Sequence, residues 1–592
     1  MKTDIDKNKW LPVSKKEAEQ RGWQELDIIL FTGDAYVDHP SFGVAVIGRI
    51  LEKQGYKVAV VAQPNWRDDL RDFKKFGKAK LFFGVTSGNM DSMVNHYTAN
   101  IRIRSTDAYT PNNQAGFRPD RATVVYSQIL RKIYPDSSII IGGIEASMRR
   151  LTHYDYWSNK LLPGILAESN ADLLVYGMGE KPILEIAKLL DKGINISEIQ
   201  NTRQTAFLTK KEKLKADKRW ENVFLNSHND CLKSKIKFAK NFKIIETESN
   251  KLKSNFRLIQ AIGQKQIVVN PANSYLSEKE LDEIYELPFT RLPHPKYLKR
   301  GKIPAFEMIK FSVNVHRGCF GGCSFCTISA HQGKFISSRS EKSILAEVEN
   351  ISKMHDFKGH LSDIGGPSAN MYKMAGFDLS ICEKCKRPSC IFPSVCYNLN
   401  TNHEKLLNIY TKVSKHPKVK KATIGSGIRY DLFFEKDAKT YTKSAYKYFT
   451  ELVKEHVSGR LKVAPEHVSD KVLRIMRKPS FKLFVSLKKT FDEINKKHNL
   501  NQQIIPYFIS SHPESEKSDM ALLASQTKDL NFQLEQVQDF TPTPMTLATV
   551  MFYSGYDPYS LKKVYTAKTK SEKLKQRDYF FWYKKGKNKR HF

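Results

Sequence analysis

Residues 317–326 read RGCFGGCSFC, and this stretch places three cysteines in the spacing C-x3-C-x2-C, at Cys319, Cys323 and Cys326. Three thiolates this close can hold three irons of a cubane cluster and leave the fourth iron without a protein ligand. Three glycines in the same stretch allow the backbone to wrap tightly around such a group. A zinc site completed by His316 or His331 is the alternative, but structural zinc usually uses paired ligands two to four residues apart. The stretch therefore indicates an iron–sulfur cluster.

The cysteine stretch follows the first of six strand-like segments in the second half of the chain. These segments are 311–315, 361–364, 422–424, 461–464, 504–509 and 534–537, and each except the last is followed by a helical pattern. Consecutive βα units with right-handed crossovers curl into a barrel or part of one, and the loops after the strands build its site. The sequence predicts a partial (βα)6 barrel over 309–545, with the cysteines at its site edge.

The first half of the chain also alternates strand and helix patterns, which predicts an open α/β sheet domain over 1–285. Most of its strands end in turns with Gly or Asp, so these turns lie at the edge where ligands usually bind. The alternative is that the glycines only provide turns. Residues 192–265 are rich in Lys and weakly periodic, which predicts an insertion or flexible arm, and the Pro-punctuated residues 286–308 predict a linker.

Composition excludes several classes of protein. The chain has 592 residues and 68.1 kDa, with 40% hydrophobic and 27% charged residues, which is typical of a globular protein of several domains. It contains no run of 18 or more apolar residues, and the first ten residues are polar, so neither a membrane span nor a signal peptide is expected. We expect a cytoplasmic protein without a membrane partner.

The chain is strongly basic. Lys and Arg number 97 and Asp and Glu 62, which gives a net charge of +35. RNA binding is one interpretation of this charge, since basic residues neutralise phosphates. The other is that codon bias toward A and T makes lysine abundant without a functional role. The densest basic run lies in a C-terminal extension, 546–592, interrupted by Phe580, Phe581, Trp582 and Tyr583. These aromatic residues suit either stacking on bases or docking of the tail onto the protein's own surface.

Four further cysteines form a second group with the spacing C-x2-C-x4-C-x5-C: Cys382, Cys385, Cys390 and Cys396. Four thiols this close satisfy the ligand requirement of a closed metal site, and we expect a second metal, either zinc or an auxiliary iron–sulfur cluster, with a slight preference for zinc. A set of free thiols is the alternative. The eighth cysteine, Cys231, stands alone and is expected to be an inert thiol.

The first cysteine stretch resembles the radical S-adenosylmethionine (radical SAM) superfamily, whose loop reads C-x3-C-x-aromatic-C, with Phe325 as the aromatic residue. The resemblance implies a [4Fe-4S] cluster whose free iron binds S-adenosylmethionine, and a 5′-deoxyadenosyl radical formed by one-electron cleavage. It also implies that Gly365, Gly366 and Pro367 form the turn that binds the methionine amino group, although the usual acidic residue is absent. Glu466 would contact the ribose or substrate. The alternatives without a functional role are that Glu466 is a charge at a helix N-terminus and that His467 is a surface residue.

Further motifs narrow the resemblance to the YgiQ-type family of that superfamily, and they extend over nearly the whole chain. They are HRGCFGGC at 316–323, DIGGPSANMY at 363–372, GGIEAS at 142–147, HYDYW at 153–157, HPKY at 294–297, IPA at 303–305, HQG at 331–333, SSRS at 337–340 and QVQDFTP at 536–542. The family has no settled reaction, so the resemblance implies a chemistry and leaves the substrate open.

The resemblance leaves two classes of function. The first is a radical SAM enzyme that modifies RNA or protein, because DKVLRIMR at 470–477 is similar to methylthiotransferases. Such an enzyme implies a flavodoxin- or ferredoxin-type electron donor. The second is an iron–sulfur protein without turnover, either an electron carrier or an RNA-binding module. Cobalamin is a minor alternative cofactor for the N-terminal domain: Asp38 and Gly43 match the motif D-x-H-x-x-G, but Pro40 replaces its His.

Overall fold

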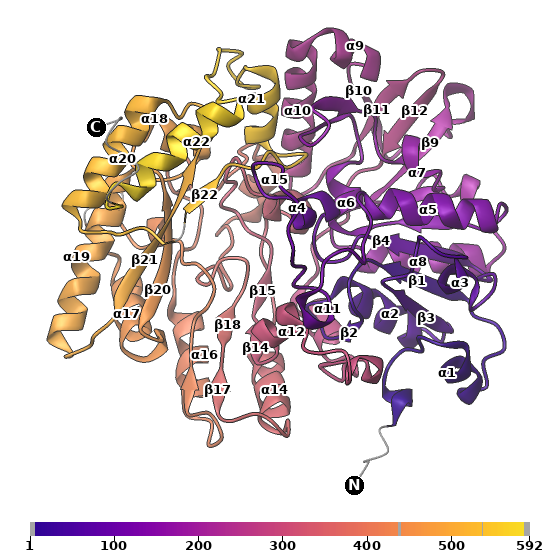
Figure 1. Ribbon diagram of the computed structural model, residues 1–592, viewed down its shortest axis with the longest axis horizontal. Helices are drawn as coiled ribbons and strands as arrows, with labels where there is room; N and C mark the ends of the chain where they lie inside the picture. Colours follow the sequence, from indigo (N-terminus) through magenta and orange to yellow (C-terminus); the bar gives the residue numbers. More distant parts are fainter. Residues whose placement is uncertain (1–5, 436–439, 536, 585–592) are drawn as a thin grey trace. The chain divides into compact units, whose positions relative to one another are not determined.

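The computed structural model describes residues 6–435, 440–535 and 537–584 (Figure 1). The chain divides into two compact units, each assembled from several segments. The first unit comprises Met1–Asn241, Lys253–Ser274 and Asp282–Lys310, and the second comprises Phe242–Leu252, Tyr275–Leu281 and Phe311–Phe592. Both units combine strands and helices, so the α/β class expected from the sequence is confirmed.

The first unit is built around a mixed nine-stranded sheet in the order β10-β11-β12-β9-β8-β5-β4-β1-β3. Its strands are β1 (Ile28–Thr32), β3 (Val58–Ala62), β4 (Phe82–Thr86), β5 (Ile139–Ile141), β8 (Leu173–Val175), β9 (Thr205–Lys210), β10 (Glu221–Phe224), β11 (Phe256–Ile262) and β12 (Lys265–Val269). The five strands from β8 to β3 are parallel to one another. β1 and β3 are continuously apolar and fully buried, as expected for parallel strands covered on both faces.

Helices pack in pairs over this sheet. α2 (Gly43–Lys53) packs against α8 (Glu180–Asp191), while α5 (Ala122–Ile133) packs against α3 (Arg71–Lys74) and α7 (Leu166–Ser169). The remaining helices of the first unit are short: α1 (Lys15–Gln20), α4 (Ser92–His96), α6 (Gly143–Met148), α9 (His228–Lys233) and α12 (Pro304–Ile309). Two small antiparallel pairs complete it: β2 (Val37–Asp38) with β13 (Leu292–Pro293), and β6 (His153–Asp155) with β7 (Lys160–Leu162).

The structure differs from the expectation for 192–265, because this segment carries regular elements rather than a flexible arm. It supplies β9, β10, β11 and the start of β12 to the sheet, and also α9 and α10 (Lys235–Ser249). β10 is an edge strand with mostly exposed side chains, which explains its weak apolar pattern. The predicted linker also packs within the first unit, since β13 pairs with β2 and the Tyr36 amide donates to the Tyr297 hydroxyl oxygen at 3.0 Å.

The second unit contains the parallel strands that the sequence predicts for a partial barrel. β14 (Ser312–Asn314) pairs with β18 (Asp363–Gly365), and β17 (His360–Leu361) pairs with β19 (Lys421–Ala422). β20 (Arg460–Glu466), β21 (Gln503–Ser510) and β22 (Val537–Asp539) form a third ladder. Each predicted segment overlaps one of these strands, which lie in three separate parallel ladders.

Helices connect these strands. They are α14 (Glu341–Ser352), α16 (Glu404–Ser414), α17 (Lys443–Glu451), α18 (Asp470–Met476), α19 (Phe481–Lys497) and α20 (Lys517–Asp529), with α21 (Leu547–Ser554) and α22 (Lys570–Asp578) after the last strand. Shorter helices are α11 (Glu278–Tyr285), α13 (Ile328–Gln332) and α15 (Leu379–Lys384). No helix among the described residues is both long and apolar enough to cross a bilayer.

The C-terminal extension packs on the second unit through its own aromatic and polar residues. Phe580 is fully buried, the Tyr583 hydroxyl donates to the Leu534 carbonyl at 2.9 Å, and the Gln576 side chain accepts from the Ser511 amide at 2.9 Å. Lys573 is only 2% exposed, and burial lowers its pKa to about 8. These contacts favour docking of the tail over stacking on bases. The basic residues at 585–592 lie outside the described residues.

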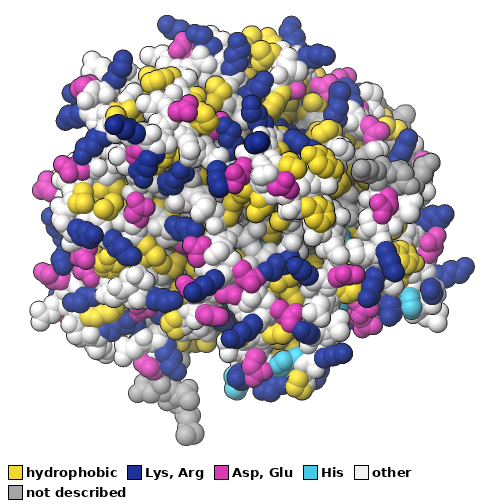
Figure 2. Space-filling view, turned by 180° about the vertical axis from the view of Figure 1, so that it is seen from behind, with side chains coloured by type: hydrophobic (Ala, Val, Ile, Leu, Met, Phe, Trp, Pro, Cys, Tyr) yellow, Lys and Arg dark blue, Asp and Glu magenta, His cyan; other side chains and the backbone are white. Residues whose placement is uncertain are grey.

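The surface charge is also spread out. On the face in Figure 2, the Lys and Arg side chains of the described residues lie among Asp and Glu rather than in one basic patch.

We expect Phe580→Ala to lower the free energy of unfolding by about 3–4 kcal/mol, because it removes a fully buried ring. Phe377→Ala is the matched control, since that ring is 73% exposed and its loss is expected to cost less than about 1 kcal/mol. Urea denaturation followed by tryptophan fluorescence measures both variants. Equal losses would show that the tail does not dock as described.

Candidate functional site

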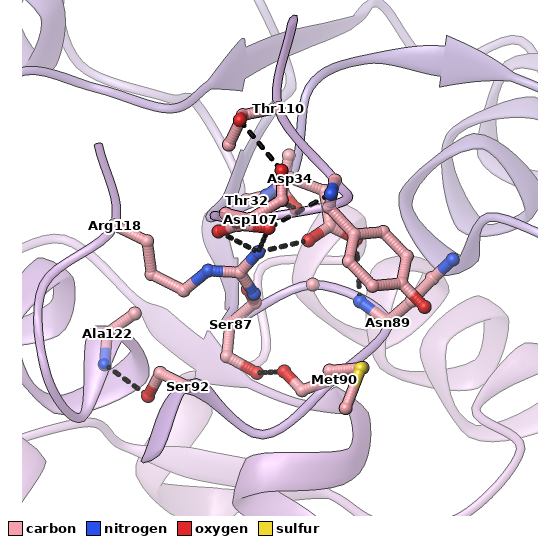
Figure 3. Close-up of polar contacts among 12 residues, drawn as sticks. Thr32, Asp34, Ser87, Asn89, Met90, Ser92, Asp107, Thr110, Arg118 and Ala122 are labelled. Atoms are coloured by element: carbon pink, nitrogen blue, oxygen red, sulfur yellow. Dashed lines mark hydrogen bonds and ion pairs between the residues drawn. The ribbon is translucent and has the colours of Figure 1, made fainter. Parts of the chain in front are cut away.

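The carboxyl edge of the N-terminal sheet, where the sequence places a ligand, holds a buried network of the protein's own charges (Figure 3). The Arg118 guanidinium lies 2.9 Å from the Asp34 carboxylate after β1 and 3.2 Å from that of Asp107. It also donates to the Ser87 carbonyl after β4, at 2.8 Å. Burial raises the pKa of Asp34 to about 6, and the charge of Arg118 opposes this shift.

This network fills the space between the turns after β1 and β4. A Cβ at Gly88 would lie 2.1 Å from an Asp34 carboxylate oxygen, and one at Gly33 would lie 2.4 Å from the Ser87 carbonyl. Glycine is therefore required here by close packing, which supports the view that these glycines provide turns. Asp38, from the partial cobalamin motif, forms a buried ion pair with Arg49 at 2.6 Å. Neither feature offers a ligand for cobalamin.

The loop with the three cysteines starts at the end of β15 (His316–Arg317), which pairs with β16 (Ser337–Ser338). The Cys319 amide donates to the Gly333 carbonyl at 3.1 Å, and the Cys326 amide donates to the Cys323 carbonyl at 3.1 Å. α13 follows the third cysteine. The loop is thus closed on itself by backbone hydrogen bonds, and all three thiols are free.

Two glycines make this loop sterically possible. Gly318 has φ +87°, and a Cβ there would lie 2.2 Å from the Phe335 carbonyl oxygen. Gly322 has φ +59°, and its Cβ would lie 2.6 Å from the Pro388 carbonyl oxygen. Both positions combine left-handed backbone with contact to another backbone segment, so no other residue fits without moving the chain.

The surroundings of the loop act on two of its thiols. Burial, together with the Cys323 and Cys319 thiols, raises the pKa of Cys326 to about 12, and burial also raises the pKa of Cys319. Among the described residues, no group of three or more His, Cys, Asp or Glu side chains converges closely enough to hold a single metal ion. The three cysteines of the loop supply the three thiolates that a cubane cluster with one open iron takes from the protein.

One cation faces the loop directly, and sequence reasoning missed it. The Arg429 guanidinium donates to the Cys323 sulfur at 3.2 Å and is paired with Asp431 at 2.6 Å. Burial opposes its charge, but Asp431 and Cys323 raise the pKa of Arg429 well above its usual value. Arg429 follows the third predicted strand, and that position at the carboxyl edge was the signal that could have identified it.

The predicted Gly365-Gly366-Pro367 turn lies beside the cysteine loop. The Gly365 carbonyl accepts from the Val315 amide at 2.7 Å, and a Cβ at Gly366 would lie 2.5 Å from the His316 ring. Pro367 is half-buried, and Ser368 after it places its hydroxyl 3.7 Å from the Cys319 sulfur. The turn and the thiols therefore form one site.

His316 adds an unpaired polar group to this site. Both of its ring nitrogens are buried without a hydrogen-bond partner in the described structure, and burial lowers its pKa to about 3. A neutral imidazole left unpaired next to a glycine turn is the kind of group that a bound ligand or water satisfies. His316 therefore gives this turn a buried polar group that is available to a ligand beside the thiols.

Other predicted residues lie around the same loop. Glu466 ends β20 with φ +71°, is 9% exposed, and burial raises its pKa to about 6. The negative charge of Glu466 contributes to the raised pKa of the Cys326 thiol, so the carboxylate lies near the loop. The Phe325 ring packs edge-on against His512 with centroids 5.9 Å apart. His467 is fully buried, which contradicts a surface position.

A hollow beside Cys323 and Cys326 is lined from the other side by the end of α10 and by Met545–Leu547. Glu246 of this helix pairs with Arg477 at 2.7 Å and accepts from the Tyr559 hydroxyl at 2.5 Å. Arg477 in turn reaches the Gly322 carbonyl at 3.4 Å. The end of the Lys-rich segment therefore covers the cysteine loop, which its sequence did not predict.

The predicted second cysteine group lies next to the first loop. All four thiols are half-buried and free, and Cys382 lies on α15. The Cys390 amide donates to the Phe320 carbonyl at 3.1 Å, and Ser389 donates to the same oxygen at 3.2 Å. The two cysteine groups are therefore joined by direct hydrogen bonds.

Comparison with known proteins agrees with this geometry. Residues 10–312 match the family model described as Radical SAM N-terminal, and residues 535–584 match a domain of unknown function, DUF3362. The first match covers half of the chain, so the protein is a member of the radical SAM superfamily. More particularly, it belongs to the UPF0313 family, which confirms the YgiQ-type resemblance.

The UPF0313 relatives are similar over nearly their full length. The protein of Porphyromonas gingivalis is 60% identical over 97% of this chain and 90% of its own, and that of Bacteroides thetaiotaomicron is 59% identical over 97% and 94%. A Clostridium botulinum protein is 45% identical over 96% and 86%. The solved radical SAM methyltransferase TsrM of Kitasatospora setae aligns at 13% identity with a TM-score of 0.47, over 88% of this chain and 74% of that one.

We expect Gly318→Ala to abolish the ability of the loop to bind iron, because its Cβ would meet the Phe335 carbonyl at 2.2 Å in left-handed backbone. Gly427→Ala is the matched control in a neighbouring loop, where an added Cβ meets nothing within 4 Å. Iron content after anaerobic reconstitution measures both. Full iron content in Gly318→Ala would contradict the steric account.

Proposed function

We propose that this protein is a radical SAM enzyme whose partial (βα)6 barrel binds a [4Fe-4S] cluster through Cys319, Cys323 and Cys326. The observation that carries the proposal is the glycine-built loop that gathers the three thiols beside the turn at Gly365 and Gly366. When bound, the cluster and S-adenosylmethionine supply a 5′-deoxyadenosyl radical by one-electron cleavage of the sulfonium.

The chain's own residues have distinct tasks around this loop. Arg429 donates to the Cys323 sulfur and offsets the negative charge of thiolate ligands, while Asp431 orients its guanidinium. Asn370 fixes the backbone of Arg429, since its side chain accepts from the Arg429 amide at 2.7 Å and donates to the Arg429 carbonyl at 3.0 Å. The position of the Arg429 cation therefore depends on the loop after β18.

The glycine turn supports binding of a small amino acid-like group. The His316 ring packs against Gly366, and its two buried nitrogens, which have no hydrogen-bond partner in the described structure, are the groups offered to a ligand at this turn. We assign to the buried Glu466 the role of accepting a hydrogen bond from a hydroxyl of the bound nucleoside. The substrate class, RNA or protein, and an electron donor of the flavodoxin or ferredoxin type are part of the proposal.

The cysteines provide the direct test. Anaerobically reconstituted protein with dithionite is expected to cleave S-adenosylmethionine to 5′-deoxyadenosine, and Cys319→Ala, Cys323→Ala and Cys326→Ala should each abolish cleavage, because each removes an iron ligand. Cys231→Ala is the control, since that thiol is buried in the first unit. Liquid chromatography of the products measures the outcome. A cluster that is reduced without any cleavage would favour the alternative, an iron–sulfur protein without turnover.

A second test concerns Arg429. Arg429→Met should make the reduction potential of the cluster more negative, because a buried positive charge near the incoming electron is lost; at about 6 Å and an effective dielectric constant of about 20, that charge contributes about 3 kcal/mol. Arg429→Lys should retain most of the wild-type potential, and Arg429→Met/Asp431→Asn should shift it less than Arg429→Met alone. An EPR-monitored redox titration compares them. An unchanged potential in Arg429→Met would exclude this role.

A further inference from the structure

The second cysteine group has features that free thiols do not need. Cys382 lies on α15, and Cys385, Cys390 and Cys396 follow it in one stretch of irregular chain. The charges of Cys385, Cys396 and Cys382 all act on the Cys390 thiol, so the four lie close together. None forms a disulfide. Half-buried thiols gathered this closely are prone to oxidation unless something holds them.

The local backbone already forms hydrogen bonds to these sulfurs. The Arg387 amide donates to the Cys385 sulfur at 3.4 Å, and the Asn398 side chain donates to the Cys382 sulfur at 3.5 Å. The Cys396 amide closes the loop on the Cys390 carbonyl at 2.8 Å. Amide donors aimed at sulfur stabilise thiolates and are typical of the surroundings of metal-bound cysteines.

A buried lysine supplies an independent observation. Lys334 is fully buried, its amino group lies 3.9 Å from the Cys385 sulfur, and it donates to the Arg387 carbonyl at 2.6 Å. In the described part of the chain, no carboxylate forms an ion pair with it. A buried cation without an anion is costly, and four metal-bound thiolates would supply the missing negative charge, whereas four neutral thiols would not.

We propose that Cys382, Cys385, Cys390 and Cys396 bind a second metal centre, and that this centre is an iron–sulfur cluster rather than a single zinc ion. The position of the thiols favours iron, because the Cys390 amide and the Ser389 hydroxyl bond to the Phe320 carbonyl of the first cysteine loop, and zinc has no redox chemistry to offer a neighbouring cluster. The proposal departs here from the slight preference for zinc drawn from the cysteine spacing.

The second centre would adjoin the first. The Cys390 amide and the Ser389 hydroxyl both bond to the Phe320 carbonyl, and Cys319 and Phe320 share an apolar cluster with Cys390 and Cys396. A cluster at this place suits electron entry to the first one. That role rests on the proposed function, but metal binding by the second group does not.

The test uses the full-length triple variant Cys319→Ala/Cys323→Ala/Cys326→Ala, which removes the first cluster. After anaerobic purification and reconstitution with iron and sulfide, it should retain one cluster per chain, measured as iron, acid-labile sulfide and a Mössbauer spectrum. Zinc in place of iron would overturn the cluster assignment, and the absence of both would overturn the site. Because this readout needs no S-adenosylmethionine cleavage, it fails or succeeds separately from the proposed function.

Four further variants in the triple background make the assignment specific. Adding Cys385→Ser and Cys390→Ser should remove the remaining iron, while adding Cys231→Ser should leave it unchanged. Lys334→Met should move the potential of the remaining cluster to more negative values, and Lys334→Arg should restore it. Should the triple variant not fold, the iron content of otherwise wild-type Cys385→Ser/Cys390→Ser protein replaces it: half the wild-type iron supports the proposal, and an undiminished content overturns it.

Discussion

The cysteine loop depends on two positions that have no side chain. At Gly318 the Phe335 carbonyl, and at Gly322 the Pro388 carbonyl, lie where a Cβ would have to be, and both residues adopt left-handed backbone. The first contact closes the loop on the strand that follows it, and the second lets the other cysteine segment pack against it. The thiols, the Gly365-Gly366 turn and Arg429 reach one another only because the backbones approach this closely.

Much of the fold could be predicted because its strands are short apolar runs between polar turns. Each predicted barrel segment overlaps a parallel strand. The prediction fails over 192–265, where edge strands such as β10 expose most of their side chains and lack an apolar pattern. The docked tail was one of two open interpretations, and the burial of Phe580 favours it.

The residues of the site, like the elements of the fold, were only partly predictable from the sequence. Cysteines, glycines and their spacing are local signals, so the loop and the turn were predictable from sequence. Arg429, Lys334 and Glu246 were not, because a charged residue on a basic chain looks the same whether it is solvated or buried against sulfur. Glu246 pairs with Arg477, which is 231 positions away in the sequence, and no local sequence pattern predicts such a contact.

Because each unit is assembled from several segments, the second unit cannot be cut from the gene as one continuous piece. Most of the second unit is formed by Phe311–Phe592, but the unit also includes Phe242–Leu252 and Tyr275–Leu281 from earlier in the chain. A gene fragment starting after 310 would encode Arg477 and Tyr559 without Glu246, and Phe335 without the Tyr275 ring that packs on it 5.1 Å away. The second unit is therefore not a module that recombination can transplant with a single crossover.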